Sequence, residues 1–367
     1  MVTTIIFLIV LTVLVFVHEL GHFLAAKAFK IRVDEFAVGF PPRLWSFMRK
    51  GTRFAINLVP LGGYVKIHGE NAEDEITPDS ILAKPRWQQA VVLIAGVTFN
   101  VLFAWLLLSL AFVIGTKAST AGFPADKITD TGIRIAFVAP GSPAEVAGIK
   151  PGVEILKVES PSASLATSTL KVSAIQDVIS QSSSTVTFTV KDQVTLKDET
   201  IILSPKEGIV PGKKAIGISM DEVGTIKLGP IDAVLYGAKS TWVMTENVAL
   251  GLWGFIKGLV ISENGAKDAL KSVSGPVGIA GIVGSSAQQG FSILLAITAV
   301  ISINLAVLNL MPFPALDGGR LVVVAIEGII RRRLNPKIIN WVNAIGFLLL
   351  IGLMLVVTFK DVWMLFK

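Results

Sequence analysis

Four long apolar segments constrain the fold of this chain more than any other feature of its sequence. They cover residues 5–26, 88–115, 291–310 and 338–359. At about 1.5 Å of rise per helical residue, each is long enough to cross roughly 30 Å of hydrocarbon. The hydrophobic content of 52% and the mean hydropathy of +0.68 are too high for a soluble protein of this length. The sequence therefore predicts a polytopic α-helical membrane protein in a lipid bilayer, with about four transmembrane helices.

The first apolar segment is interpreted as a retained span rather than a removable signal peptide. A signal peptide begins with a positively charged region, and its apolar part is about 7–15 residues long. No Lys or Arg precedes Ile5, and the apolar run is longer than that. We therefore expect residues 5–26 to remain in the membrane.

Charge and cysteine content exclude several classes of site and partner. The chain has no cysteine, so it has neither disulfides nor thiolate metal ligands. Its formal net charge of +6 is explained by basic loops that flank membrane spans. We therefore expect no nucleic-acid partner.

Basic residues gather in two of the connections between the apolar segments. They are Lys30, Arg32, Arg43, Arg49, Lys50, Arg53, Lys66 and Lys84 in the first, and Arg320, Arg331, Arg332, Arg333 and Lys337 in the third. Connections rich in Lys and Arg face the cytoplasm. This pattern predicts that both termini, and the long interval 116–290, lie on the outer side.

The remaining intervals show weaker patterns. Short apolar runs separated by Ser, Gly and Pro predict a β-rich domain over residues 132–204. Residues 230–261 have helical spacing interrupted by charges, which favours an interfacial amphipathic helix over the alternative of a fifth span. The cytoplasmic stretch FAINLVPLGGYVKIHGE, residues 54–70, predicts a hairpin or looped strands with Gly62 and Gly63 at the turn.

The first span carries the pattern HExxH as His18, Glu19, Leu20, Gly21 and His22. On a helix this spacing puts the two imidazoles on one face, able to bind one zinc ion, with Glu19 as a base for its water. The alternative is two histidines that satisfy each other in a helical core. Ionisable groups inside a span are unfavourable unless they are functional, which favours the metal site.

A catalytic zinc ion needs a third protein ligand. The only other histidine, His68, is interpreted as a solvated loop residue. Asp317 is the better candidate, because Pro312 and Pro314 end the third span and Gly318 and Gly319 allow a tight turn beside it. The first and third spans both run from outside to inside, so Asp317 can lie at the depth of His18 and His22. The alternative role for Asp317 is that of a turn residue at a helix end.

These motifs together resemble the site-2 protease family of intramembrane zinc metalloproteases, close to the bacterial regulator of sigma-E protease branch. The resemblance covers nearly the whole chain. It is carried by HELGHF, GGYVKIHGE, SGPVGIA at residues 274–280 and NLMPFPALDGGR at residues 309–320. HExxH alone occurs in many metalloproteases, but its combination with the distant LDGG is specific.

The resemblance implies roles for individual residues. His18, His22 and Asp317 would bind Zn²⁺, and Glu19 would activate the water. Asn309 is similar to an asparagine that holds the substrate backbone, and Asn304 would assist it; helix packing is the alternative for both. Gly63, Tyr64 and Val65 belong to a membrane-associated β loop that would add a strand to an unwound substrate.

The stretch GSPAEVAGIKPGVEILKV, residues 141–158, resembles part of a PDZ domain. Val153 stands where such stretches usually have Asp. A single PDZ-like domain fits, whereas the best-known members of the branch have two. We expect four parts: residues 1–115 as the N-terminal half of the membrane core, 116–225 as the PDZ-like domain, 226–290 as the interfacial helical segment, and 291–367 as the C-terminal half of the core.

The resulting hypothesis is a zinc endoprotease in the inner membrane of a bacterium. Its substrates would be single-pass membrane proteins, such as anti-sigma factors or remnant signal peptides, trimmed beforehand by another protease. One alternative is a catalytically silent scaffold that uses the PDZ-like domain. Another is a different HExxH membrane protease, which would use a downstream Glu ligand such as Glu327.

Overall fold

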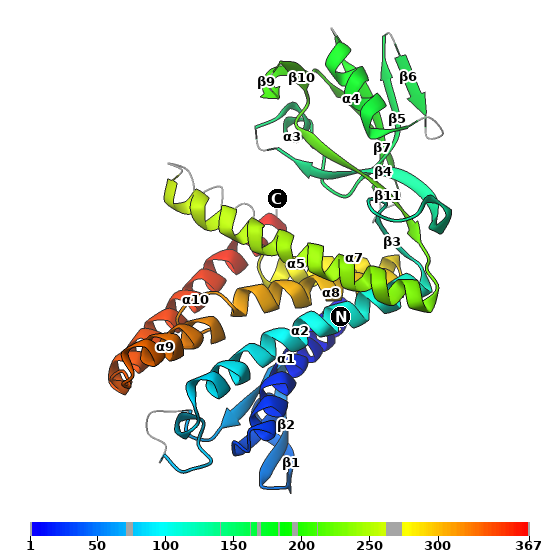
Figure 1. Ribbon diagram of the computed structural model, residues 1–367. Coiled ribbons are helices and arrows are strands. Elements are labelled where there is room, and N and C mark those ends of the chain that lie inside the picture. Colours follow the sequence, from blue (N-terminus) through cyan, green and yellow to red (C-terminus); the bar gives the residue numbers. More distant parts are fainter. Residues whose placement is uncertain are drawn as a thin grey trace. The chain divides into compact units, whose positions relative to one another are not determined.

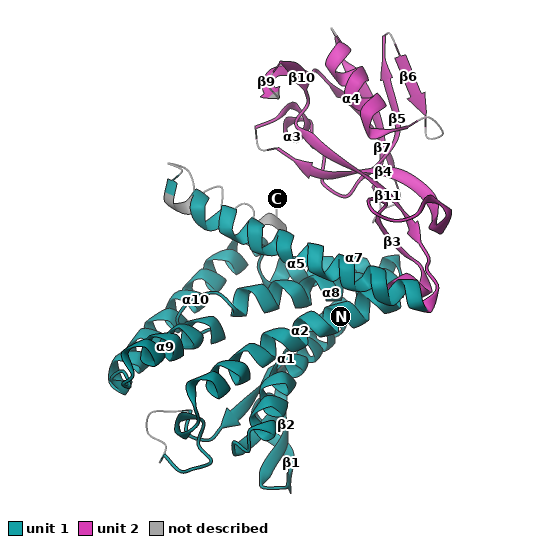
Figure 2. Ribbon diagram, viewed as in Figure 1, with its two compact units in different colours: residues 1–110, 231–367 teal, residues 111–230 magenta. Residues whose placement is uncertain are grey.

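Long helices and a β-rich segment form separate parts of this chain. A computed structural model describes residues 2–70, 76–139, 141–161, 163–166, 170–182, 184–192, 197–210, 212–261 and 274–365. One compact unit combines residues 1–110 with residues 231–367, and the other contains residues 111–230 (Figure 2). The first unit is mainly helical and the second is β-rich (Figure 1).

Helices make up most of the first unit. They are α1 (Val2–Ala28), α2 (Arg86–Ile114), α5 (Pro230–Ile261), α7 (Pro276–Gln289), α8 (Phe291–Asn309), α9 (Asp317–Ile330) and α10 (Pro336–Leu365), with a 3-10 turn at Ile81–Ala83. Within the described residues, four of them are long and apolar enough to cross a membrane: α1, α2, α8 and most of α10. The prediction of about four apolar helices is confirmed. Helix α5 is not among the four.

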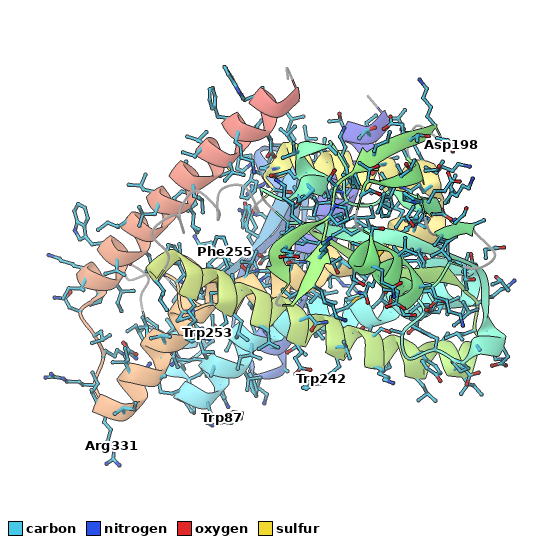
Figure 3. All side chains as sticks on the ribbon, turned by 90° about the horizontal axis from the view of Figure 1, so that it is seen from above. Trp87, Asp198, Trp242, Trp253, Phe255 and Arg331 are labelled. Atoms are coloured by element: carbon cyan, nitrogen blue, oxygen red, sulfur yellow. The ribbon has the colours of Figure 1, made fainter. Side chains whose placement is uncertain are left out.

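Large apolar side chains cover much of the outer surface of these helices. Trp87 on α2 and Trp242 and Trp253 on α5 project outward and are 60–73% exposed (Figure 3). Most of the large apolar side chains of α10 are exposed in the same way. Apolar surface of this extent is stable in contact with lipid but not with water.

The break between α8 and α9 follows from its prolines and glycines. Pro312 and Pro314 have no N–H and cannot continue α8, which ends at Asn309. A Cβ atom at Gly318 would collide with the carbonyl oxygens of Leu310 and Met311. Gly318 and its neighbour Gly319 are helical, so the expectation that they supply a tight turn is wrong. They are needed because α9 begins in close contact with the chain that leads into it.

A small antiparallel sheet follows α1. Its strands are β1 (Val33–Arg49) and β2 (Thr52–Ile67), and their tight turn lies at Lys50 and Gly51, which have φ values of 47° and 76°. Residues 36–38 of β1 pair on one side with residues 54–56 and on the other with residues 63–65. The prediction that Gly62 and Gly63 form the turn is therefore wrong, because both lie inside β2. The chain bends there so that residues 63–67 become an edge of the sheet.

The second unit is built around a seven-stranded sheet. Its strands are β3 (Thr116–Ser119), β4 (Ile128–Val138), β5 (Glu154–Ser160), β6 (Ala163–Ala166), β7 (Val186–Lys191), β8 (Asp198–Leu203) and β11 (Ile218–Ile226). The order is β3-β11-β4-β5-β7-β8, with β6 paired to β5. Strands β9 (Lys206–Val210) and β10 (Lys213–Ala215) form a separate hairpin.

Two short helices and a 3-10 turn complete the second unit. They are α3 (Pro143–Val146), α4 (Val172–Gln181) and the turn at Ala125–Lys127. Alternate residues of β7, among them Val186, Phe188 and Val190, are buried, as expected for a strand with one face on a core. Helix α4 contributes Ile175 and Ile179 to the same core. The predicted β-rich middle region is confirmed.

Candidate metal centre

Helix α1 places two imidazoles on one face, one turn apart. His18 and His22 are both buried, with only 6% and 7% of their surfaces exposed. Side chains separated by four residues are neighbours on a helix, and the two ring centroids are 4.7 Å apart. Their Nε2 atoms are 3.1 Å from each other. The pair thus presents two nitrogen donors to one point.

Asp317 brings a carboxylate to the same point from the first turn of α9. Its Oδ2 lies 3.0 Å from Nε2 of His18 and 3.3 Å from Nε2 of His22. Two ligands of a tetrahedral zinc ion, each about 2.0 Å from the metal, lie about 3.3 Å apart. The spacing of these two nitrogen atoms and one oxygen atom therefore fits a zinc ion, and a tetrahedral site leaves one position for water.

Glu19 lies beside this cluster and is held by the neighbouring sheet. It is close enough to His18, His22 and Asp317 to interact with all three electrostatically. Its Oε2 accepts a hydrogen bond of 3.0 Å from the backbone N–H of Val65. The backbone of β2 thus orients the carboxylate.

Helix α2 lies close to the imidazoles because Gly96 has no side chain. A Cβ atom at this position would lie 2.5 Å from Nε2 of His22 and 2.9 Å from Cε1 of His18. Gly21 of α1 has the matching role, since a Cβ atom there would collide with the carbonyl oxygen of Ala95. Two glycines therefore allow the close contact of α1 and α2 at the site.

The same face of α2 contacts the outward nitrogen of each imidazole. Nδ1 of His22 lies 2.8 Å from the carbonyl oxygen of Val92, and Nδ1 of His18 lies 3.2 Å from Nδ2 of Asn100. Our sequence analysis did not identify Gly96, Val92 or Asn100. Asn100 carried a usable signal, because an amide in the middle of an apolar span needs a partner.

The two predicted asparagines of α8 have different positions. Nδ2 of Asn309 lies 3.5 Å from Nε2 of His18, so its side chain is at the cluster. Asn304 donates a hydrogen bond of 2.8 Å to the carbonyl oxygen of Val300 in its own helix. The structure therefore brings Asn309, but not the amide of Asn304, to the metal centre.

The predicted loop residues Gly63, Tyr64 and Val65 lie in β2, in the part that forms the sheet edge. A Cβ atom at Gly63 would lie 2.6 Å from the carbonyl oxygen of Ala37, so the close strand pairing requires glycine. The Tyr64 hydroxyl donates to Glu35 over 2.9 Å. Burial is the main cause that raises the pKa of Tyr64, and the hydrogen bond to Glu35 raises it further. The hydroxyl is therefore protonated and a donor at neutral pH.

Two further ion pairs hold the segments near the sheet. Glu35 also accepts two hydrogen bonds from Arg43, of 2.8 and 3.0 Å, which link two parts of β1. Glu70, just after β2, pairs with Arg320 of α9. The chain that leaves the sheet is thus attached to the helix that carries Asp317.

Two other residues considered in the sequence, His68 and Glu327, form ion pairs outside the metal centre. The His68 side chain is only 14% exposed, and its Nδ1 lies 3.2 Å from Oδ2 of Asp34. The expectation of a solvated loop histidine is wrong, because pairing with Asp34 after β2 buries the ring. Glu327 pairs with Arg86 over 2.8 Å and accepts from the backbone N–H of Leu334. Its carboxylate is therefore occupied away from the metal centre.

Known proteins with similar sequences match this chain over nearly its full length. The sequence profile of Peptidase family M50 matches residues 6–353. A protein of Clostridium perfringens, named as a candidate zinc metalloprotease, is 34% identical over 361 residues, which are 97% of each chain. A protein of Fusobacterium nucleatum with the same description is 31% identical over 100% of each chain. Another, from Synechocystis, is 34% identical over 96% of this chain and 92% of its own. The chain therefore belongs to peptidase family M50, the site-2 protease family, and is a zinc metallopeptidase of the membrane.

Proposed function

We propose that this protein is an intramembrane zinc endoprotease that cuts single-pass membrane proteins within or near their spans. His18, His22 and Asp317 bind the metal, and Glu19 is the general base. The observation that carries this proposal is the position of Glu19: it lies beside the three donor atoms and is hydrogen-bonded to the edge strand of β2. Base, metal ligands and a surface for an extended peptide thus adjoin one another.

Zinc, when bound, polarises the scissile carbonyl and lowers the pKa of its water toward about 7. Glu19 accepts the proton from the attacking water and returns it to the leaving amine, and this transfer requires a carboxylate with one free oxygen. Only Oε2 of Glu19 is bonded to Val65, so Oε1 is the atom that we assign to the proton. We assign to Asn309 the holding of the substrate backbone, because its Nδ2 lies 3.5 Å from Nε2 of His18.

The substrate has to be extended at the scissile bond, because a transmembrane helix uses its peptide groups internally. Residues 63–67 of β2 pair with β1 on one side only, and within the described chain no strand pairs with their other side. A peptide added to that edge would lie next to Glu19. We therefore expect substrates whose spans contain helix-weakening residues.

We infer a topology with both termini on the outer side of a bacterial inner membrane. The basic residues around β1 and β2, and those between α9 and α10, favour a cytoplasmic location for these segments. The metal centre lies toward the C-terminal end of α1. This orientation puts it nearer the cytoplasmic face, and α5 then lies at the outer interface.

We further propose that the second unit is a PDZ-like filter for outer segments of the substrate. Its α3 is capped by Ser142, which accepts from the N–H of Glu145, and the Glu145 side chain accepts from the N–H of Gly141, one residue before the cap. Val153, found where such stretches usually have Asp, is buried in the core. An apolar residue is therefore suitable at that position.

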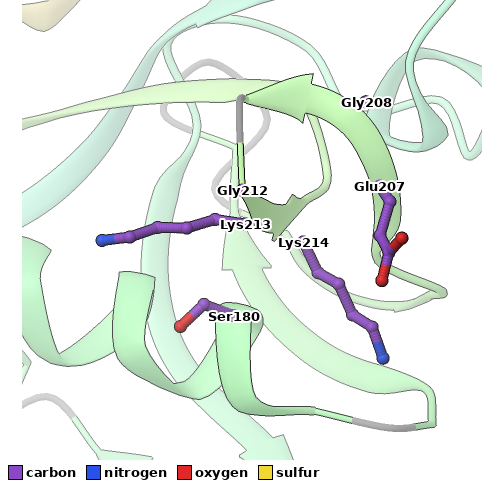
Figure 4. Close-up of a pocket in the computed structure, with 6 residues that line it drawn as sticks. All are labelled: Ser180, Glu207, Gly208, Gly212, Lys213 and Lys214. Atoms are coloured by element: carbon purple, nitrogen blue, oxygen red, sulfur yellow. The ribbon is translucent and has the colours of Figure 1, made fainter.

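Two neighbouring pockets of this unit, of about 590 and 410 Å³, are both lined by Lys213 and Lys214. Figure 4 shows the two lysine side chains at the larger pocket, with Glu207 beside Lys214. The ammonium group of Lys213 favours an anionic ligand such as the carboxylate of a newly made C-terminus, whereas Nζ of Lys214 donates to the carbonyl oxygen of Ser182 over 3.3 Å. We therefore expect substrates that another protease has already trimmed.

A different HExxH protease with Glu327 as the third ligand receives less support, because that carboxylate is paired with Arg86. The test of the proposal is the conversion of a single-pass reporter in vesicles that contain the purified protein. The intact protein should cut the reporter inside its span, whereas Glu19→Gln should bind zinc equally and release no product. Equal products from both proteins would overturn the proposal.

A further inference from the structure

Asn100 is the one strongly polar side chain of α2 that reaches the histidine pair. It is fully buried, with 0% of its surface exposed. Its amide lies 3.2 Å from Nδ1 of His18, and its Oδ1 has no hydrogen-bond partner within the described residues. A buried amide oxygen without a partner destabilises the fold. Its position therefore requires an explanation.

The proton position that zinc binding requires on His18 decides which end of this amide faces the ring. His18 directs Nε2 toward Asp317 and His22, so Nε2 must keep a lone pair if it binds zinc. The proton of the neutral ring then lies on Nδ1, which becomes a donor. An amide group can turn by 180° and exchange its oxygen and nitrogen. Only the orientation with Oδ1 of Asn100 toward Nδ1–H of His18 makes a hydrogen bond. In the other orientation the amide N–H of Asn100 faces the N–H of the ring, and both groups are donors.

We propose that Asn100 is a positioning residue that accepts a hydrogen bond from Nδ1–H of His18 and thereby holds this imidazole for zinc. The inference rests on the proposed ligand role of His18. It also assigns a function to the face of α2 formed by Val92, Gly96 and Asn100, which follow one another at intervals of four residues. The Val92 carbonyl orients His22, Gly96 makes room for both rings, and Asn100 orients His18.

The chain offers a matched control at the same residue. The backbone carbonyl of Asn100 accepts a hydrogen bond of 2.8 Å from Ser302 of α8. Ser302→Ala therefore disturbs the packing of α2 on α8 at residue 100 but leaves the side-chain acceptor in place. A role of Asn100 in packing alone would make the two sites respond alike.

The test uses the full-length protein in detergent and the variants Asn100→Leu, Asn100→Asp and Ser302→Ala. Zinc affinity is measured by competition with a chelator, independently of activity. Removing a hydrogen-bond partner of a metal ligand lowers affinity by about 10–100-fold, and we expect this loss for Asn100→Leu. Asn100→Asp keeps an acceptor and should bind zinc as the wild type or more tightly, and Ser302→Ala should be close to wild type.

A second measurement covers the case in which Asn100→Leu does not fold. The chain has three histidines, so nitrogen-15 spectra of labelled wild-type protein can report the protonated nitrogen of each ring. Zinc-loaded wild type should show the His18 proton on Nδ1. A His18 Nδ1 proton that is not hydrogen-bonded to the Asn100 side-chain oxygen, or wild-type zinc affinity in Asn100→Leu, would overturn the proposal, whereas a proton on Nε2 would contradict the ligand role of His18. Retention of zinc in His18→Ala would instead disprove the ligand assignment in the proposed function.

Discussion

The backbone N–H of Val65 donates a hydrogen bond of 3.0 Å to Oε2 of Glu19, and so connects the edge of β2 directly to the proposed general base. The two residues are 46 positions apart and belong to different elements. The other backbone N–H and C=O groups on the open side of this edge strand remain available to pair with a substrate. Substrate pairing and base orientation therefore depend on the same few residues of β2.

Replacing Val65 by proline should separate these two roles from metal binding. Proline has no N–H, but it is tolerated on an edge strand where the N–H points away from the sheet. We expect Val65→Pro to keep zinc and to lose roughly 100-fold in kcat/KM, because the base is no longer held in place. Val65→Ala keeps the N–H and serves as the control. Turnover of Val65→Pro at the wild-type rate would contradict the assigned contact.

The sequence predicts the proposed metal ligands and base better than it predicts the neighbouring residues that position them. His18, Glu19 and His22 lie within one turn of one helix, so their spacing alone indicates a shared face. Asp317 was found because it follows a helix break marked by two prolines. Both signals are local in the chain, and the structure brings the four side chains close together.

Contacts between distant segments left no comparable signal. The closeness of Gly96 to both imidazoles depends on how α1 and α2 cross, and no spacing within either helix encodes that crossing. Gly62, Gly63, Gly318 and Gly319 were assigned to turns because glycine permits unusual backbone angles. At Gly63 and Gly318 the structure shows the other use of glycine, which is close approach to a carbonyl oxygen.

Loss of any proposed ligand should release the metal. His22→Ala and Asp317→Ala each remove one of three donor atoms, so we expect the zinc content of the purified proteins, measured by atomic emission, to fall to a small fraction of the wild-type value. Glu19→Gln should retain zinc and lose about 10²–10⁴-fold in activity. Full zinc and activity in Asp317→Ala would show that another group is the third ligand.

A methyl group at Gly96 should also weaken zinc binding, although it replaces none of the ligands. Its Cβ would lie 2.5 Å from Nε2 of His22, so the imidazoles or the helices must shift. We expect Gly96→Ala to bind zinc more weakly and to melt at a lower temperature. Gly352→Ala in α10 is the control, since no atom lies within 4 Å of its added Cβ. Equal zinc affinity in the two variants would contradict the packing described for α2.

The proposed topology can be tested because the chain has no cysteine. Ser184 lies just before β7, and Arg332 lies between α9 and α10. Both residues are exposed. In intact cells, an impermeant thiol reagent should label Ser184→Cys directly, but Arg332→Cys only after the membrane is opened. The opposite pattern would invert the orientation and place the metal centre near the outer face.

Deletion of the sheet in the second unit should separate substrate selection from catalysis. The N–H of Leu228 lies 2.9 Å from the carbonyl oxygen of Phe112, so a short Gly/Ser linker can replace residues 116–226. All residues assigned to the chemistry belong to the first unit, and we therefore expect the shortened protein to keep zinc and to cut a trimmed reporter. If the second unit is a filter, the shortened protein should also cut an untrimmed reporter that the intact protein refuses. Cleavage of paired long and trimmed reporters measures both effects. A zinc-loaded, folded protein that cuts neither reporter would exclude the filter, because the unit would then be required for every cleavage.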